Sequence, residues 1–174
     1  ALNPDRQGEI VWEHRVGAGN RRGGTMWGSA ADDAVVYVPN VDTQLGPGKA
    51  GGLTALRLDT GAEVWSVKPP VPDCKVNDES CAPGQSAAVT IIPGAVFSGS
   101  TNGVMRAYSA EDGHVMWQFS AMGEPIMTVN GVAGRGGSIN GAGPTVVGGM
   151  VFMNSGYAYG GDTPGNLLIA FGVD

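Results

Sequence analysis

The feature of this chain that most limits its fold is an internal repeat of 52 to 53 residues. In each copy a tryptophan follows a glycine by four positions, and the three pairs are Gly8 with Trp12, Gly61 with Trp65, and Gly113 with Trp117. Apolar segments also recur in step with these pairs: they lie at 35–38, 95–98 and 150–153, and again at 52–56, 103–108 and 166–171. Similarity at such a fixed period indicates a fold built from stacked, equivalent units.

Each unit predicts three or four short strands, because its apolar segments are four to six residues long and are bounded by Gly, Asp or Asn. The chain contains 30 glycines and 11 prolines among 174 residues, and no stretch of a dozen residues avoids both while keeping a helical apolar pattern. A hydrophobic content of 42% with 15% charged residues argues against disorder. Four strands in each unit of this size predict the blades of a β-propeller.

The repeat divides the chain into the end of one blade at 1–20, a blade at 21–70, a blade at 82–121 and a last blade at 122–174. We therefore expect an all-β partial propeller of about three four-stranded antiparallel blades, with the repeated tryptophans wedged between neighbouring blades. Since propellers close with about four to eight blades, three would leave two open sheet faces. We expect the chain to be the C-terminal part of a propeller of seven or eight blades, with the remaining blades as its partners.

The charge of the chain excludes some partners. The net charge is −6 at pH 7, whereas nucleic acids and anionic membranes attract basic surfaces. No apolar run approaches the roughly 20 residues of a transmembrane helix, and no signal peptide is visible. We expect neither a nucleic-acid partner nor a membrane span.

Two segments resemble a motif of a known family. Residues 55–65, Ala-Leu-Arg-Leu-Asp-Thr-Gly-Ala-Glu-Val-Trp, resemble the tryptophan-docking motif of the PQQ-dependent quinoprotein dehydrogenases, and 107–117 is a second copy. The aspartate at the third position of that motif is replaced by Arg57 and Ser109. Scaffold propellers of the bacterial outer-membrane assembly machinery carry similar repeats, so the motif alone leaves the function open.

Longer stretches of the sequence make the resemblance more specific. Residues 24–40 resemble the segment of quinoprotein alcohol dehydrogenases that supplies the tryptophan beneath the quinone. Residues 70–88 and 129–144 are similar to the polyvinyl alcohol dehydrogenases of the cytochrome-linked type, and the similarity extends over nearly the whole chain. The resemblance implies PQQ and calcium as cofactors.

The resemblance also implies roles for individual residues. Trp27, which has glycines on both sides, would stack on the quinone, although an ordinary core tryptophan is the alternative. Arg135 would bind a carboxylate of PQQ or polarise a quinone carbonyl, with Ser138 and Asn140 donating to the same carboxylates; the alternative is an exposed loop arginine. Asn40 would be a ligand of Ca²⁺, although asparagine is also a common turn residue.

We nominate no catalytic residue. The family uses an aspartate to take the alcohol proton. The place to look for it, the third position of a docking motif, holds Arg57. We expect the base to lie in the missing blades.

Cys74 and Cys81 are the only cysteines, and they lie in a Pro- and Asp-rich segment. An even count in a loop predicts a disulfide, which fits an oxidising compartment such as the periplasm. No histidine lies near enough to suggest zinc, and no Cys-x-x-Cys-His haem motif is present.

Two functions therefore compete. One is a periplasmic PQQ-dependent alcohol dehydrogenase that oxidises hydroxyl groups, with polyvinyl alcohol as one substrate, and passes electrons to cytochrome c, the haem lying outside this chain. As a fragment, the chain would be inactive. The other is a non-catalytic propeller scaffold of the outer-membrane assembly type.

Overall fold

A computed structural model describes residues 1–173 except 20, 22–23, 46–47 and 71–81. Apart from the short 3₁₀ turns Pro4–Arg6 and Thr43–Leu45, its regular elements are β-strands. The strands are β1 (Leu2–Asn3), β2 (Glu9–Ile10), β3 (Ala30–Ala31), β4 (Val35–Pro39), β5 (Leu53–Arg57), β6 (Glu63–Val67), β7 (Thr90–Ile92), β8 (Ala95–Gly99), β9 (Val104–Ser109), β10 (Val115–Ser120), β11 (Ile126–Met127), β12 (Ala133–Gly134), β13 (Thr145–Val147), β14 (Met150–Ser155) and β15 (Leu167–Phe171).

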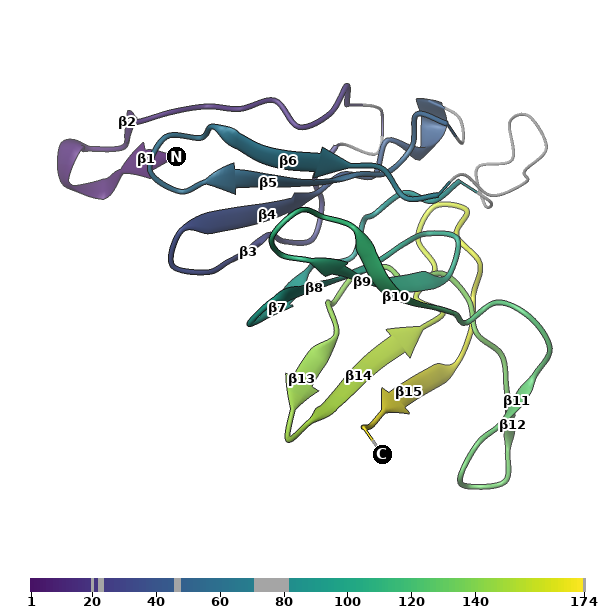
Figure 1. The fold of residues 1–174 in the computed structure, drawn as a ribbon. Helices are drawn as coiled ribbons and strands as arrows, with labels where there is room; N and C mark the ends of the chain where they lie inside the picture. The colour runs from purple at the N-terminus through teal and green to yellow at the C-terminus, as the bar shows by residue number, and fades with distance from the viewer. Residues whose placement is uncertain (20, 22–23, 46–47, 71–81, 174) are drawn as a thin grey trace.

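Three antiparallel sheets follow one another with one common topology, and the pairs β1-β2 and β11-β12 form two-stranded sheets (Figure 1). Two sheets have four strands, in the orders β3-β4-β5-β6 and β7-β8-β9-β10, and a third has the order β13-β14-β15. The first strands lie together, since β7 contacts β3 on one side and β13 on the other. Sheets that follow one another around their first strands are blades of a propeller. The predicted fold class is confirmed.

The register of the strands repeats as the sequence does. Tyr37 pairs with Ala55, which pairs in turn with Trp65. In the next sheet Phe97, Ala107 and Trp117 hold the same three positions. Both outer strands have a bulge directly before the tryptophan, at residues 64 and 116. A β-bulge bends and twists its strand, so each tryptophan leaves the sheet in the same way.

The glycines of the repeat receive the tryptophans of the preceding unit. Gly61 has φ +70°, and a Cβ there would lie 2.4 Å from the ring of Trp12. The indole Nε1 of Trp12 donates to the carbonyl of Leu58 at 2.9 Å. Trp65 repeats the arrangement over Gly113. The repeat therefore encodes the contact between sheets as well as the strands.

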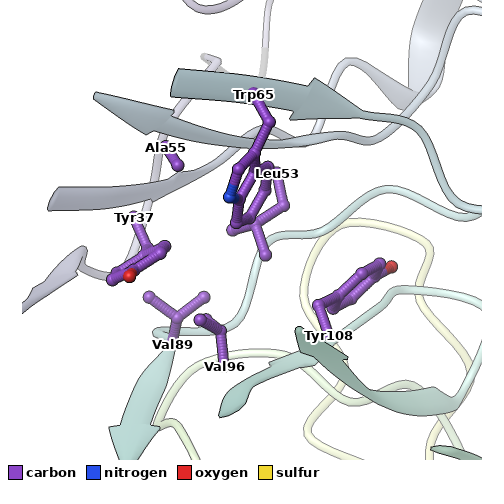
Figure 2. Close-up of a cluster of buried hydrophobic side chains, with 7 residues drawn as sticks. All are labelled: Tyr37, Leu53, Ala55, Trp65, Val89, Val96 and Tyr108. Atoms are coloured by element: carbon purple, nitrogen blue, oxygen red, sulfur yellow. The ribbon is translucent and has the colours of Figure 1, made fainter. Parts of the chain in front are cut away.

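Apolar side chains fill the space between the first two complete sheets (Figure 2). Tyr37, Leu53 and Trp65 come from the first sheet, and Val96 and Tyr108 come from the second. A second buried cluster, which includes Phe97, Met105, Ile139 and Met153, separates the second sheet from the third. These two layers fix the positions of the loops at the sheet ends.

Candidate functional site

The long connections of the sheets gather at one end. In an antiparallel sheet, the start of the first strand and the connection between the second and third strands lie at the same end of the sheet. Equivalent hydrogen bonds join these segments in each unit: Val41 N to Gly24 O at 2.7 Å, Thr101 N to Gly84 O at 2.8 Å, and Gly156 N to Ser138 O at 2.8 Å. The sites predicted at Trp27, Asn40, Ser138 and Asn140 all lie at this end, which we call the loop end.

Trp27 lies directly before β3, and 44% of its surface is exposed. Its Nε1 donates to Oδ1 of Asn140 at 2.7 Å, and Tyr157 meets its ring edge-on with centroids 6.1 Å apart. One edge of the indole is thus fixed by protein while part of its surface remains open. This is the arrangement expected of a ring that stacks on a planar ligand.

Asn140 is a buried hub that holds Trp27. Its Oδ1 also accepts from the hydroxyl of Ser86 at 2.7 Å and from the amide of Gly141 at 2.8 Å. Its Nδ2 donates to Asp162 at 2.6 Å. These partners engage both ends of the amide, so Asn140 holds the indole of Trp27 in place.

Ser138 lies two residues from Asn140 and is fully buried. Its hydroxyl donates to the carbonyl of Thr101 and accepts from the amide of Thr163 at 2.9 Å. Both hydrogen-bonding functions are therefore used within the protein. The structure gives Ser138 a place in the scaffold of the loop end.

Arg135 is exposed, and no hydrogen bond between described residues joins it to Trp27 or Asn140. Its backbone is fixed by Asn166, whose Oδ1 accepts from Arg135 N at 2.8 Å. The residue lines a hollow of about 410 Å³ together with Pro164, Gly165 and Asn166. Among the described residues, no side chain forms an ion pair with its guanidinium, so that group is available to an anion.

Asn40 follows β4 and is 5% exposed. Its Nδ2 donates to Oδ2 of Asp42 at 2.8 Å, while its Oδ1 is buried and meets no donor in the part of the chain that the structure describes. Calcium prefers oxygen ligands such as amide carbonyls and carboxylates. An unused carbonyl oxygen beside a carboxylate fits one side of such a site. No group of three His, Cys, Asp or Glu side chains completes a metal site among the described residues.

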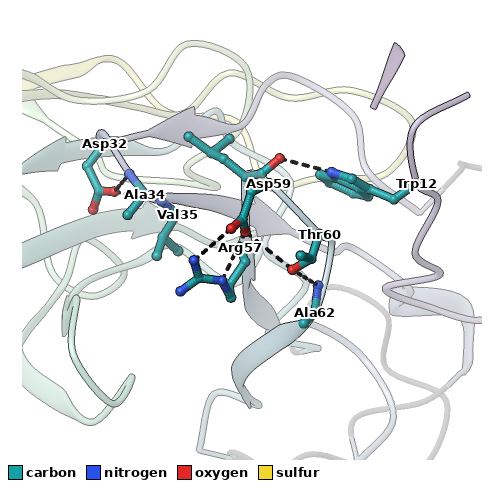
Figure 3. A network of polar contacts seen from close by, with 9 residues as sticks. Trp12, Asp32, Ala34, Val35, Arg57, Asp59, Thr60 and Ala62 are labelled. Carbon is teal, nitrogen blue, oxygen red and sulfur yellow. Dashed lines mark hydrogen bonds and ion pairs between the residues drawn. The ribbon is translucent and has the colours of Figure 1, made fainter. Parts of the chain in front are cut away.

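The turn that carries Arg57 joins β5 to β6, so it lies at the opposite end of its sheet from the loop end. Figure 3 shows the polar contacts of this turn. Arg57 donates to Asp59 through two bonds of 2.9 and 2.8 Å, and both side chains are exposed. The Arg57 guanidinium lowers the pKa of the Asp59 carboxyl. The third position of the motif therefore belongs to a turn at the end of the sheet opposite the loop end, where Arg57 is paired with Asp59.

The sequence did not reveal three contributors to the loop end, namely Ser86, Tyr157 and Asp162. All three act on Trp27 or Asn140 from distant parts of the chain, and no local pattern marks them. Cys74 and Cys81, the predicted disulfide, lie outside the described residues. Among the residues described, no helix has the length and apolar character needed to span a membrane.

Antiparallel sheets in succession, joined by docked tryptophans and carrying their long loops at one end, define a β-propeller of the tryptophan-docking class. The sequence matches, over residues 1–136 and again over 49–171, the PQQ-type repeat family described as outer membrane protein assembly factor BamB. The chain belongs to this family.

Comparison with individual proteins gives a narrower similarity than the family match. The chain is 44% identical over 182 residues to polyvinylalcohol dehydrogenase of Pseudomonas sp. and 38% identical over 186 residues to that of Sphingopyxis sp. (strain 113P3). Both matches cover 100% of this chain and 28% of the relative. The structure of quinohemoprotein alcohol dehydrogenase from Comamonas testosteroni is similar with a TM-score of 0.53 and 20% identity, over 76% of this chain and 17% of that one. This structural likeness confirms the fold.

Proposed function

We propose that this chain is part of a PQQ-dependent alcohol dehydrogenase that oxidises hydroxyl groups, including those of polyvinyl alcohol. The observation that carries the proposal is the half-exposed indole of Trp27, fixed by Asn140 at the loop end. The similarity of the whole chain to two polyvinylalcohol dehydrogenases supports it.

PQQ, when bound, would supply the redox chemistry by accepting two electrons from the alcohol. The indole face of Trp27 would support the flat ring system by stacking, which contributes on the order of 1 kcal/mol beyond the area it buries. Arg135 would bind a carboxylate of the cofactor through its planar guanidinium. Ser138 and Asn140 would contribute by fixing the loops that present these two groups, since their own polar atoms are already paired.

Calcium would bind beside Asn40, whose Oδ1 would be one of its ligands. The buried and unused state of that oxygen supports the assignment, because an unsatisfied buried acceptor costs about 1–3 kcal/mol. Since calcium takes six to eight oxygen ligands, the remaining ligands and the catalytic base would come from other parts of the protein.

We further propose that other blades complete the ring and that the 174 residues are its C-terminal part. The chain spans 28% of the length of each curated relative described above. Its β13–β15 sheet has three strands among the described residues, where the two preceding sheets have four. On this proposal the enzyme is periplasmic, cytochrome c accepts its electrons, and Cys74 and Cys81 form a disulfide.

Dye-linked activity of the full-length protein tests the proposed function. The protein, purified without cofactors, should reduce an artificial electron acceptor in the presence of polyvinyl alcohol only after PQQ and Ca²⁺ have both been added. The 174-residue chain alone should show no turnover, because a partial ring cannot enclose the cofactor. A full-length protein that remains inactive with both cofactors and a range of alcohols would contradict the proposal.

A second candidate function is that of a non-catalytic scaffold. The family description favours it, since docking repeats specify blades rather than chemistry. A scaffold would bind protein through its blades and would have no affinity for PQQ. Equilibrium dialysis of the full-length protein against PQQ separates the two functions, because only the enzyme should retain the cofactor.

A further inference from the structure

The orientation of the Asn40 side chain is set by its neighbour Asp42. The Nδ2 of Asn40 donates to Oδ2 of Asp42 at 2.8 Å, and a carboxylate can accept but not donate. With the amide reversed, Asn40 would place its own oxygen against the carboxylate. Asp42 therefore forces Asn40 to present its Oδ1 on the other side, where this atom is buried without a donor among the described residues.

Asp42 is itself held firmly. Its carboxylate accepts from the backbone amides of Ala18 at 3.0 Å and Gly19 at 3.2 Å, in addition to Asn40. The residue is 2% exposed and has φ +33°, a conformation that few residues other than glycine adopt. These three donors fix the carboxylate in place, so it can hold the Asn40 amide in one orientation.

The charge of Asp42 is not neutralised by an ion pair within the described ranges. The residue and Asn40 line a cavity of about 220 Å³, and the cationic residues of this cavity are Lys49 and Lys68. Lys68 directs its Nζ to the backbone carbonyl of Lys49 at 3.0 Å, and both lysines are exposed. A buried anion next to an unused carbonyl oxygen favours a cation at that oxygen.

The segment that covers the pair requires a glycine. A Cβ on Gly17 would lie 2.5 Å from Nδ2 of Asn40 and 2.7 Å from both Oδ1 of Asn40 and Oδ2 of Asp42. Such distances are impossible without displacement of these side chains. Gly17 thus allows the 17–19 segment to close over the pair and to donate its amides to Asp42.

We propose that Asp42 is the positioning residue of the calcium site: it holds the Asn40 amide so that Oδ1 is presented to the metal, and its charge raises the affinity for a cation. This proposal rests on the proposed function, which makes Asn40 a calcium ligand. It adds a residue that determines whether Asn40 can serve as one.

Calcium titration calorimetry of the full-length protein, with and without saturating PQQ, tests the proposal. We expect Asp42→Asn to weaken Ca²⁺ binding about tenfold, because the new amide can turn its NH₂ towards Asn40 and no longer fixes the Asn40 amide. Asn40→Ala should weaken binding at least as much. In the Asn40→Ala background, Asp42→Asn should cost less calcium affinity than it does alone, because only the effect of its charge then remains. Asp33→Asn, which removes an exposed carboxylate in a turn, is the matched control for charge and should bind like the unmodified protein.

The outcomes separate this proposal from the proposed function. If Asn40→Ala weakens calcium binding and Asp42→Asn does not, Asp42 has no positioning role and the proposed calcium site stands. If Asn40→Ala leaves calcium binding unchanged, the calcium site and the role of Asp42 both fail. If Asp42→Asn does not fold, as judged by circular dichroism, Gly17→Ala decides, because it displaces the pair without changing its charge. A Gly17→Ala protein with unchanged calcium affinity would overturn the proposal.

Discussion

The indole of Trp27 is tied to Asn140 by a 2.7 Å hydrogen bond that joins positions 113 residues apart in the sequence. Asn140 in turn accepts from Ser86, so the segments that precede the first strands of three successive sheets meet at one amide. Each segment comes from a different unit of the repeat. The position of the Trp27 ring therefore depends on the assembled loop end, in which residues of three units meet.

Replacing Asn140 tests this dependence. Asn140→Ala removes the acceptor of Trp27, Ser86 and Gly141, and an unpaired buried donor costs about 1–3 kcal/mol. We expect a loss of about 2–4 kcal/mol in the free energy of unfolding, measured by urea denaturation. Ser86→Ala, which removes one of the donors, is the control and should cost about 1 kcal/mol. Equal losses from the two variants would contradict the role of Asn140 as a hub.

The docking glycines give a second prediction. Gly61→Ala places a Cβ 2.4 Å from the Trp12 ring at φ +70°, so it combines overpacking with backbone strain. We expect a loss of about 2–4 kcal/mol in unfolding free energy. Gly8 is the matched control, because it holds the same place in the repeat at φ +81° with nothing within 4 Å of its Cβ position. Gly8→Ala should cost only about 1 kcal/mol, and an equal cost at both glycines would rule out the docking contact.

The docking tryptophans Trp65 and Trp117 should also differ in how much each one stabilises the protein. Trp65 is 8% exposed and donates from Nε1 to Ala110 O at 3.0 Å. Trp117 is 37% exposed, and no described residue accepts from its Nε1. In the 174-residue chain, Trp65→Phe should therefore lower the thermal midpoint more than Trp117→Phe. Trp117 already contacts Phe171 of β15. In a longer protein in which the β13–β15 sheet gains its fourth strand and docking turn, Trp117 should be covered as Trp65 is, and the two losses should become similar. A difference that persists there would contradict the proposed completion of the ring.

Tyr108, which is buried between the first two complete sheets, gives a prediction for the pH dependence of stability. Burial raises the pKa of Tyr108 to about 12, from 10. A raised pKa means that the folded state holds the proton more tightly than the unfolded state. The stability that the Tyr108 hydroxyl contributes is therefore complete below pH 10 and is lost as the pH rises towards 12. Two pKa steps correspond to about 2–3 kcal/mol. Tyr108→Phe, which loses the hydrogen bond from Gln85, should be less stable at pH 8 but should show a smaller decline between pH 10 and 12. Parallel stability profiles for the two proteins would contradict this.

The fold could be predicted because its determinants repeat. The spacing of Gly8 and Trp12 recurs in two further pairs, and a local pattern that occurs three times at intervals of 53 and 52 residues predicts both the strands and the contact between sheets. The structure adds the physical reason, which is that Gly61 and Gly113 each receive the tryptophan of the preceding unit. The bulge before each tryptophan had no visible signal, since its residues, Val64 and Met116, continue the apolar pattern of the strands.

The candidate site was less accessible to sequence reasoning, because its contacts join distant segments. Trp27 was singled out by its place outside the repeat, and the structure leaves it half exposed. Ser138, Asn140 and Arg135 were grouped because they are close in sequence. The backbone separates them, directing Ser138 inward, Asn140 to Trp27, and Arg135 to the surface beside Asn166. Which of these groups meets a ligand is decided by tertiary contacts that no spacing in the sequence encodes.

The decisive measurement is the affinity of Trp27 variants of the full-length protein for PQQ, determined by equilibrium dialysis in the presence of Ca²⁺. Trp27→Ala removes the stacking surface and should weaken PQQ binding at least tenfold, while Trp27→Phe, which keeps an aromatic face but loses the bond to Asn140, should fall in between. Trp12→Phe, a change in a docking tryptophan, should leave the affinity unchanged. An unchanged PQQ affinity in a folded Trp27→Ala protein would show that the cofactor does not bind at this end of the propeller.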